Sequence, residues 1–471
     1  WDGSSKSPKG YRWGTFPSVA VAWRLSEERF LQKEWLNNLK LRLSYGVSGN
    51  NTGIGNYETT VGIGSPIYYP FGPDYWTGQF PGSIVDADLH WEKSYEYNAG
   101  IDFGFLQNRI NGSIDIYQKN SKELLYGVNL PLEAGGGNLK TNIGRVQNRG
   151  VEIALTTVNI TNRDWEWTTT FTFAHNSNKV KEINGVSNEL INGATGSLFV
   201  GKSISTLYGH EWGGIVTDQM MTVPDHEIAV AKGYTPGQPI RMCDYYYDVY
   251  GLQEGNVYIV DQNGDGSITD EDKITFNGEP KWTGSVTSNL TYRLPKNGGM
   301  LDFSFNIYAK QGFKVYSAFM NNDLFRHDQR ARNSIACDFY LPKGALVDAD
   351  GMREDGTYIN PVYMTQTHYG DWATMGGTSN MGAGSQMNQW NDARKFVDGS
   401  FVKVKNITLG YTFSKNILKH IACQNLRLYF TVTNPFVWTK YKGFDPEWAD
   451  AAAKNDGPSI ISYQVGASIK F

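Results

Sequence analysis

The chain has 471 residues, of which 43 are basic and 47 acidic, so its formal net charge is −4. A charge so close to balance argues against a nucleic-acid partner. A mean hydropathy of −0.44 and the lack of any apolar stretch of 18 residues argue against membrane-spanning helices.

Eleven segments alternate apolar and polar side chains with a period of two, which predicts β-strands that have one apolar and one polar face. In the second segment, for example, Leu41 and Leu43 lie on one face and Arg42 on the other. In chain order the predicted strands are 17–25, 38–48, 95–105, 109–118, 151–157, 165–174, 282–293, 301–310, 401–413, 426–433 and 463–471.

The apolar face of such strands either packs against a second sheet, as in a soluble β-sandwich, or faces lipid, as in a membrane barrel. Soluble strands average about five or six residues, whereas barrel strands need about 9–11 to cross a bilayer, and most of these segments have the longer length. Aromatic residues also gather at segment ends, as the girdles of a membrane barrel require. These residues are Trp165, Trp167, Tyr292, Tyr411 and Tyr463. The membrane barrel is therefore the favoured fold.

The connections between the segments are alternately short and long. The long ones are 49–93, 119–150, 175–281, 311–400 and 434–462. Outer-membrane barrels have short periplasmic turns, long extracellular loops and an even number of strands. The eleven strands therefore predict a part of a larger barrel whose remaining strands come from an N-terminal portion, with Phe471 on the periplasmic side. Hairpins within the long loops would add strands in pairs and keep this parity.

Several stretches carry a family resemblance. They are 12–18, 22–28, 41–50, 89–92, 142–152, 401–411 and Gly443 to Glu447, followed by the terminal Phe471. In their order and spacing they resemble the C-terminal half of TonB-dependent outer-membrane transporters of the SusC/RagA type. The similarity extends over essentially the whole chain.

The resemblance implies an all-β fold in which residues 1–471 supply about half of a 22-stranded transmembrane barrel with long extracellular loops. It implies that the plug domain is not in this chain, so the chain is a fragment, a proteolytic half or one half of a split protein. It further implies active import of a glycan or peptide across a Gram-negative outer membrane. The implied partners are a SusD-like lipoprotein lid, the TonB complex through the absent N-terminal part, and the surrounding bilayer with its lipopolysaccharide.

One local motif predicts a metal site. Residues 261–272 fit the template of a calcium-binding loop, with oxygen ligands at its usual spacing and Gly266 at the sharp turn. The predicted ligands are Asp261, Asn263, Asp265, Ser267 through its carbonyl, Thr269 through a water, and Asp272. Oxygen ligands suit Ca²⁺ first and Mg²⁺ as an alternative. The flanks do not resemble EF-hand helices, because Val257 to Val260 predict a strand. The alternative is a turn rich in Asp, Asn and Gly that holds its shape without metal.

The remaining motifs indicate no enzyme, because neither a metal-protease motif nor a nucleophile elbow occurs. The run from Tyr245 to Tyr247 either stacks on sugars or packs the base of a loop, with packing favoured. Two alternatives to active import stay open at this point. One is a secreted β-sandwich that binds or hydrolyses glycans, and the other is a passive porin.

Overall fold

The structure is a computed structural model that describes most of the chain. The described residues are 1–64, 66–71, 74–79, 82, 84–129, 138–185, 187–317, 338–370, 393–419, 423–441, 443, 445–448 and 459–471. Within them, no helix is long and apolar enough to cross a membrane.

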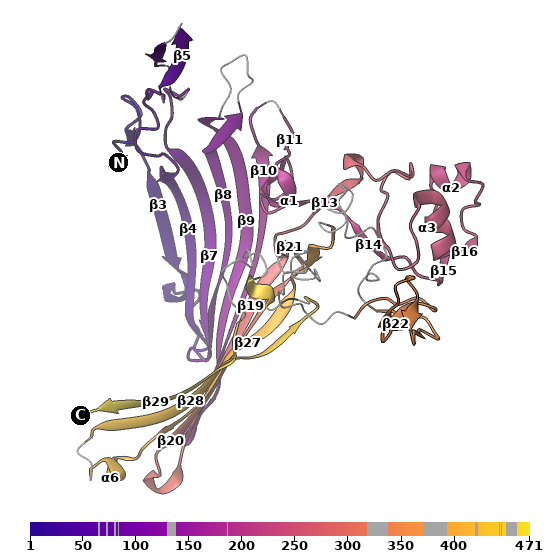
Figure 1. Ribbon diagram of the computed structural model, residues 1–471. Coiled ribbons are helices and arrows are strands. Elements are labelled where there is room, and N and C mark those ends of the chain that lie inside the picture. Colours follow the sequence, from indigo (N-terminus) through magenta and orange to yellow (C-terminus); the bar gives the residue numbers. More distant parts are fainter. Residues whose placement is uncertain are drawn as a thin grey trace.

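Eleven strands form one long antiparallel sheet, here called the sheet wall, in which each strand pairs with its neighbour in sequence (Figure 1). The strands are β3 (Ser18–Arg24), β4 (Leu36–Asn50), β7 (Glu92–Phe105), β8 (Ile110–Asn129), β9 (Asn138–Thr161), β10 (Trp165–Glu182), β19 (Trp282–Arg293), β20 (Met300–Gln311), β27 (Phe401–Thr412), β28 (Asn425–Thr439) and β29 (Ser462–Lys470). Each corresponds to one predicted segment, so the all-β fold and the odd strand number are confirmed.

The predicted bounds are too short on the long-loop side of the sheet. Most of the predicted loop 119–150 is strand, because β8 continues to Asn129 and β9 begins at Asn138. Both faces of these extensions carry polar residues, so no alternation marks them, yet the backbone ladder between the two strands continues. The hairpin β8–β9 therefore projects well past the apolar band.

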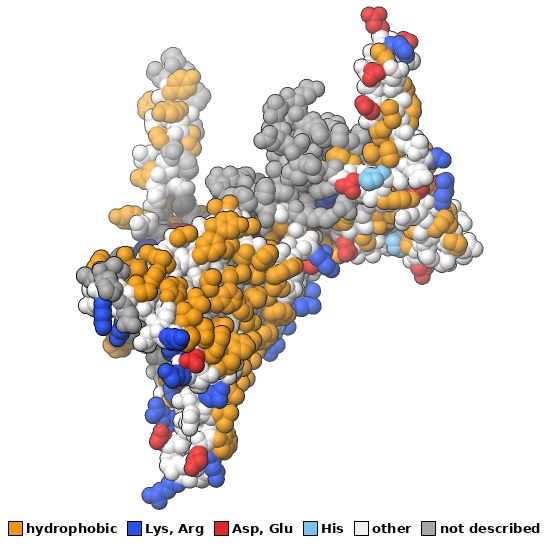
Figure 2. Space-filling view, turned by 90° about the horizontal axis from the view of Figure 1, so that it is seen from below, with side chains coloured by type: hydrophobic (Ala, Val, Ile, Leu, Met, Phe, Trp, Pro, Cys, Tyr) orange, Lys and Arg blue, Asp and Glu red, His pale blue; other side chains and the backbone are white. Residues whose placement is uncertain are grey.

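Among the described residues, no second sheet packs against the apolar face of the sheet wall. Leu43, Ile116 and Ile469 on this face are 63%, 61% and 51% exposed. Hydrophobic side chains gather in a broad field over the sheet (Figure 2). A soluble sandwich would bury these residues, so the sandwich alternative is wrong and the face is the lipid-facing surface of a barrel wall.

Aromatic rings mark the short-turn end of this surface. Trp165 on β10 stacks on Tyr292 of β19 with ring centroids 4.2 Å apart, and Trp167 is 38% exposed next to them. Trp and Tyr favour the membrane interface because their rings are apolar and one edge is polar. The stacked pair agrees with the predicted girdle.

Small elements lie outside the sheet wall. The segment before β3 holds β1 (Asp2–Gly3) and β2 (Trp13–Gly14). The long connections hold β5 (Ile67–Phe71), β6 (Asp74–Gly78), β11 (Glu189–Leu190), α1 (Gly193–Gly196), β12 (Leu198–Phe199), β13 (Leu207–His210), β14 (Trp212–Ile215), β15 (Met220–Thr222), α2 (Glu227–Ala231), β16 (Pro239–Arg241), α3 (Met242–Tyr250), β17 (Val257–Ile259), η3 (Asp270–Asp272), β18 (Lys273–Phe276), β21 (Lys314–Tyr316), β22 (Leu346–Asp348), β23 (Gly351–Met352), β24 (Tyr358–Ile359), β25 (Val362–Tyr363), β26 (Phe396–Asp398) and η7 (Pro446–Trp448). The short turns on the opposite side hold η1 (Leu25–Glu27), η4 (Pro295–Asn297) and α6 (Lys415–Leu418). In the described residues the small strands pair two by two outside the sheet wall, so the predicted parity is confirmed.

Candidate functional site

The polar face of the sheet wall lines the lumen side and is held by charged pairs that cross strands. On β4, the Nε atom of Arg42 lies 3.0 Å from both carboxylate oxygens of Asp102 on β7. Its Nη2 atom lies 2.9 Å from Oδ2 of Asp115 on β8. One guanidinium therefore ties three strands together laterally, through charge-assisted hydrogen bonds of the stronger kind.

This bridge depends on a glycine in the middle strand. Gly100 on β7 lies in register between Arg42 and Asp115. A Cβ atom there would lie 2.4 Å from Oδ1 of Asp115 and 2.6 Å from Nη2 of Arg42. The missing side chain leaves the space through which the ion pair passes.

The same arrangement recurs along the wall. The Tyr117 hydroxyl of β8 donates to Oδ1 of Asn176 on β10 at 3.0 Å, across Gly150 of β9. Farther along, Asp302 of β20 pairs with Arg427 of β28 across Gly410 of β27. The two ends of these bridges are far apart in sequence, so sequence alone did not predict them.

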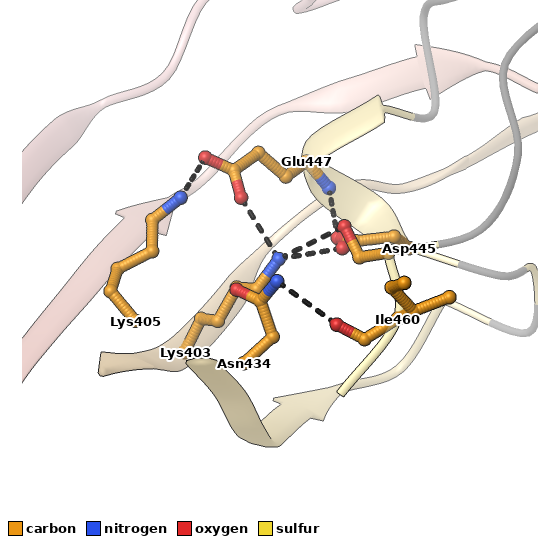
Figure 3. Close-up of polar contacts among 7 residues, drawn as sticks. Lys403, Lys405, Asn434, Asp445, Glu447 and Ile460 are labelled. Carbon is orange, nitrogen blue, oxygen red and sulfur yellow. Dashed lines mark hydrogen bonds and ion pairs between the residues drawn. The ribbon is translucent and has the colours of Figure 1, made fainter. Parts of the chain in front are cut away.

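A buried lysine anchors an extracellular loop to the lumen side of β27. Lys403 is 1% exposed, and its Nζ atom lies 2.6 Å from Oδ2 of Asp445 and 3.0 Å from Oε2 of Glu447. Lys405 also pairs with Glu447, and both lysines point toward the short η7 turn (Figure 3). These four residues are called the lysine anchor.

The electrostatics of the lysine anchor favour its charged form. Burial would raise the pKa of the Asp445 carboxyl, but hydrogen bonds from Lys403 and Ser459 outweigh it and hold the pKa below its ordinary value. Burial is outweighed in the same way at Glu447, whose pKa is lowered by the two lysines. The acids belong to the stretch from Gly443 to Glu447 that carried part of the resemblance. Phe444 lies outside the described residues.

A second feature is a compact unit within the predicted loop 175–281, built around α3. Tyr245 is 1% exposed and packs with Val223 and Ala229, while Tyr246 contacts Tyr258 of β17 with ring centroids 4.5 Å apart. Tyr247 is 63% exposed. The predicted packing role thus describes the first two tyrosines, and Tyr247 alone presents its ring to solvent.

The predicted metal loop follows β17 in this unit. Asp261 and Asp272 are 5% and 0% exposed, whereas Asn263, Asp265, Ser267 and Thr269 are exposed. The strand predicted before the loop is confirmed, and a short η3 turn with β18 follows it instead of an EF-hand helix.

The buried carboxylates accept backbone hydrogen bonds from the loop itself. Asp261 accepts from the N–H groups of Gly264 and Gly266 at 2.6 and 2.8 Å. Asp272 accepts from those of Gln262 and Thr269 at 2.9 and 2.8 Å. Both glycines have positive φ, +75° and +86°, which suits the tight turn. The backbone thus curls around both acids.

No cationic side chain pairs with either buried acid within the described part of the chain; Asp261 instead accepts a 3.0 Å hydrogen bond from the Tyr250 hydroxyl. Burial, followed by the charge of Asp261, raises the pKa of Tyr250. Among the described residues, no three acidic, histidine or cysteine side chains converge as a metal-holding group. A cation here would therefore also need the amide oxygen of Asn263 and backbone carbonyls.

Contacts between two long loops hold this unit in place. Oδ1 of Asp218 accepts a hydrogen bond from the Tyr369 hydroxyl at 2.7 Å, and its Oδ2 accepts one from Thr367 at 3.1 Å. The Tyr340 hydroxyl donates to Oε1 of Glu254 at 2.7 Å. The loops after β10 and β20 therefore form one extracellular assembly, which no local motif predicts.

Comparison with known proteins identifies the architecture. Residues 1–434 match the family model described as "TonB dependent receptor-like, beta-barrel". The TonB-dependent receptor SusC of Bacteroides thetaiotaomicron is 30% identical over 100% of this chain and 41% of its own length. A TonB-dependent receptor of Formosa agariphila is 29% identical over 95% of this chain and 41% of its own length.

Solved structures agree with the fold. The RagAB peptide importer in its "closed-closed" state superposes with a TM-score of 0.66 at 22% identity, covering 100% of this chain and 45% of that one. The "open-open" state gives a TM-score of 0.68 at 20% identity, over 99% of this chain and 44% of the other. The chain thus spans less than half the length of the proteins it matches.

Proposed function

The chain belongs to the TonB-dependent receptor β-barrel family, and from this membership we propose that it forms half the wall and several extracellular loops of an importer for a glycan or peptide. It is a SusC/RagA-like outer-membrane β-barrel protein. Membership places it among receptors and transporters and not among enzymes.

The observation that carries this proposal is the sheet wall itself. It is an eleven-stranded antiparallel sheet whose edges, β3 and β29, have no further neighbour among the described residues. Unpaired edges in lipid cost several kcal/mol for each unsatisfied backbone group. In this proposal, strands from sequence outside these 471 residues complete the barrel, and that sequence also supplies the plug and the contact with TonB.

The lid partner and the substrate are part of the same proposal. Structural neighbours are described as the RagAB peptide importer, and this likeness favours a peptide substrate and a SusD-like lipoprotein over this chain's extracellular loops. A glycan remains the alternative substrate.

The test uses the complete transporter, purified from its own outer membrane. We expect it to require detergent, to co-purify with a surface lipoprotein, and to support uptake of labelled peptide or oligosaccharide only in cells with an active TonB complex. Uptake that persists without TonB would identify a passive porin instead and contradict the proposal.

We propose separately that loop 261–272 binds Ca²⁺. Support comes from two buried carboxylates without a cationic partner in the described chain, since buried charge is retained only when it is compensated. Asp261, Asn263, Asp265, Asp272 and the Ser267 carbonyl would hold the ion, and Thr269 would contact it through water. The ion would stiffen the loop rather than take part in chemistry.

Calcium binding is tested by proteolysis of residues 257–273 with and without chelator, and by calorimetric titration of Ca²⁺ and then Mg²⁺. We expect chelation to expose the loop and Asp261→Asn to abolish the response. Asp270→Asn is the matched control, because Asp270 lies in the same loop but is not a predicted ligand and pairs with Lys273 at 2.6 Å. An unchanged digestion pattern would favour the metal-free turn.

A further inference from the structure

A groove lies on the lipid-facing surface of the sheet wall, on the side opposite the lumen bridges. Its volume is about 860 Å³, and it runs across β3, β4, β7, β8, β9 and β10. Most of its lining side chains belong to the outward-facing register rows. This outer groove plays no part in the lumen, the lysine anchor or the calcium-type loop.

The base of the outer groove is apolar. Leu43, Ala99, Ile116 and Val151 lie opposite one another on four successive strands. Ala99 is much smaller than its neighbours Leu43 and Ile116, so the row is lowest at Ala99. Such a channel between protruding aliphatic side chains fits a hydrocarbon chain that would otherwise lie against bare protein.

The next row changes from aromatic to polar along its length. Tyr45 and Tyr97 contact each other with ring centroids 4.9 Å apart, and the row continues through Gln118, Arg149 and Ser177. Hydroxyl and amide groups beside a guanidinium can bind both the sugar and the phosphate of a glycolipid headgroup.

Two cations at this end have no polar side-chain partner among the described residues: Arg149, which lines the groove, and Lys179, two residues beyond the lining residue Ser177. Neither Arg149 nor Lys179 makes a side-chain hydrogen bond or ion pair within the described residues, and Arg149 is exposed. Lys179 pairs with Gln147, and Ser177 pairs with Arg149. Arg149 and Lys179 are therefore diagonal neighbours, about 7–8 Å apart at the backbone, close enough to bind one phosphate together.

Their height agrees with the outer leaflet. Arg149 lies eleven residues along β9 from Ile160, near the short-turn end. At about 3.3 Å per residue and a tilt of about 40°, this corresponds to roughly 28 Å along the membrane normal. An apolar band about 25 Å tall thus ends just below Arg149, where the headgroups of outer-leaflet lipids lie.

We propose that the outer groove binds one molecule of the phosphorylated, acylated glycolipid of the outer leaflet, the lipid A part of lipopolysaccharide. One acyl chain lies along Ala99, the phosphate contacts Arg149 and Lys179, and the sugar contacts Gln118 and Ser177. Free cations facing outward at headgroup height complement an anionic lipid. The row of sugar-compatible polar groups favours a glycolipid over a simple phospholipid.

The experiment measures the lipid bound to the complete transporter reconstituted in nanodiscs of neutral phospholipid. The probe is purified phosphorylated lipid A, counted by native mass spectrometry. We expect about one retained molecule per wild-type transporter. In Arg149→Ala/Lys179→Ala we expect retention to fall at least about tenfold, since hydrogen bonds to charged groups contribute about 1.5–3 kcal/mol and 1.4 kcal/mol is tenfold.

Two further variants separate the parts of the site. Ala99→Trp fills the base without changing charge and should also reduce retention, whereas Arg149→Lys should retain part of it. Lys415→Ala is the matched control, because Lys415 is exposed on α6 at the opposite end of the barrel. Heat-dependent migration in gels verifies that each variant is folded, and Ala99→Trp provides an independent readout if the double variant does not fold.

Competition distinguishes the sources of phosphate. Neither inorganic phosphate nor vesicles of phosphatidylglycerol should displace lipid A at matched phosphate concentration. Displacement by inorganic phosphate would overturn the role of the acyl groove, and displacement by phosphatidylglycerol would overturn the assignment to a glycolipid. Equal retention by all folded variants, or an equal loss in Lys415→Ala, would contradict the site altogether.

Discussion

The sheet wall and the unit around α3 differ in what determines the position of their apolar side chains. In the wall, each strand has lipid on one side and water on the other, so one period-two pattern fixes which side chain faces which solvent. In the α3 unit, a small core around Tyr245 and Val223 joins short strands and helices within residues 220–250. Strands that separate lipid from water can be predicted from the alternation in a short stretch of sequence. The packing partners of a small core can be identified only from the tertiary structure.

The lysine anchor joins the sheet wall to the long loop that contains η7, and its loss should give the largest effect. Lys403→Met leaves Asp445 buried without its cation, and breaking one side of a buried pair costs about 3–5 kcal/mol. We expect faster hydrogen exchange in peptides covering 434–448, measured by mass spectrometry. Lys440→Met on the exposed end of the same loop is the control. Equal exchange in both variants would mean that the anchor does not hold the loop.

The lipid-facing surface is tested by neighbouring residues on β20. Phe305→Arg places a charge on the apolar face, which costs about 2–4 kcal/mol near the middle of a bilayer. Ser304→Arg places the same charge on the lumen face and should be tolerated. Heat-dependent migration in gels reports the folded fraction. If the Ser304 variant is as damaging as the Phe305 variant, the two faces have been assigned wrongly.

Filling the space above Gly100, over which Arg42 pairs with Asp115, should have a smaller effect on the stability of the sheet wall. Gly100→Ala forces Arg42 and Asp115 apart, and overpacking of this kind costs about 1–3 kcal/mol. At Gly46 a Cβ atom would meet only Ser18, at 3.7 Å, so Gly46→Ala is the matched control. We expect a lower thermal unfolding midpoint in detergent for the Gly100 variant alone. Equal midpoints would show that the lateral bridge contributes little.

The smallest effect at physiological pH concerns the acids of the lysine anchor. Their folded pKa values lie below the ordinary 3.8 of Asp and 4.5 of Glu. The stabilisation is therefore complete above those ordinary values and is lost as pH falls through the lowered ones. We expect hydrogen exchange in residues 434–448, corrected for the intrinsic exchange rate at each pH, to stay slow from pH 7 to pH 5 and to become faster below about pH 3.8. Exchange that already becomes faster between pH 7 and pH 5 would contradict this electrostatic account.

The sequence alone determined the strand number, its odd parity and the lipid-facing residues. Every strand has lipid on one side and water on the other, so apolar residues such as Leu43, Phe305 and Ile469 recur at every second position. It could not determine how far β8 and β9 extend, because water wets both faces there and removes the pattern. The strand before loop 261–272 was also readable, and the metal there remains a prediction.

Only the tertiary structure decided the contacts that join distant segments. Arg42 reaches Asp115 across Gly100, and Lys403 is buried against Asp445. The strand register also makes Arg149 and Lys179 diagonal neighbours on β9 and β10. The physical reason is that register and loop packing choose these partners. The alternation of apolar and polar residues around a position indicates whether its side chain faces lipid or water. It does not indicate which distant side chain that residue contacts.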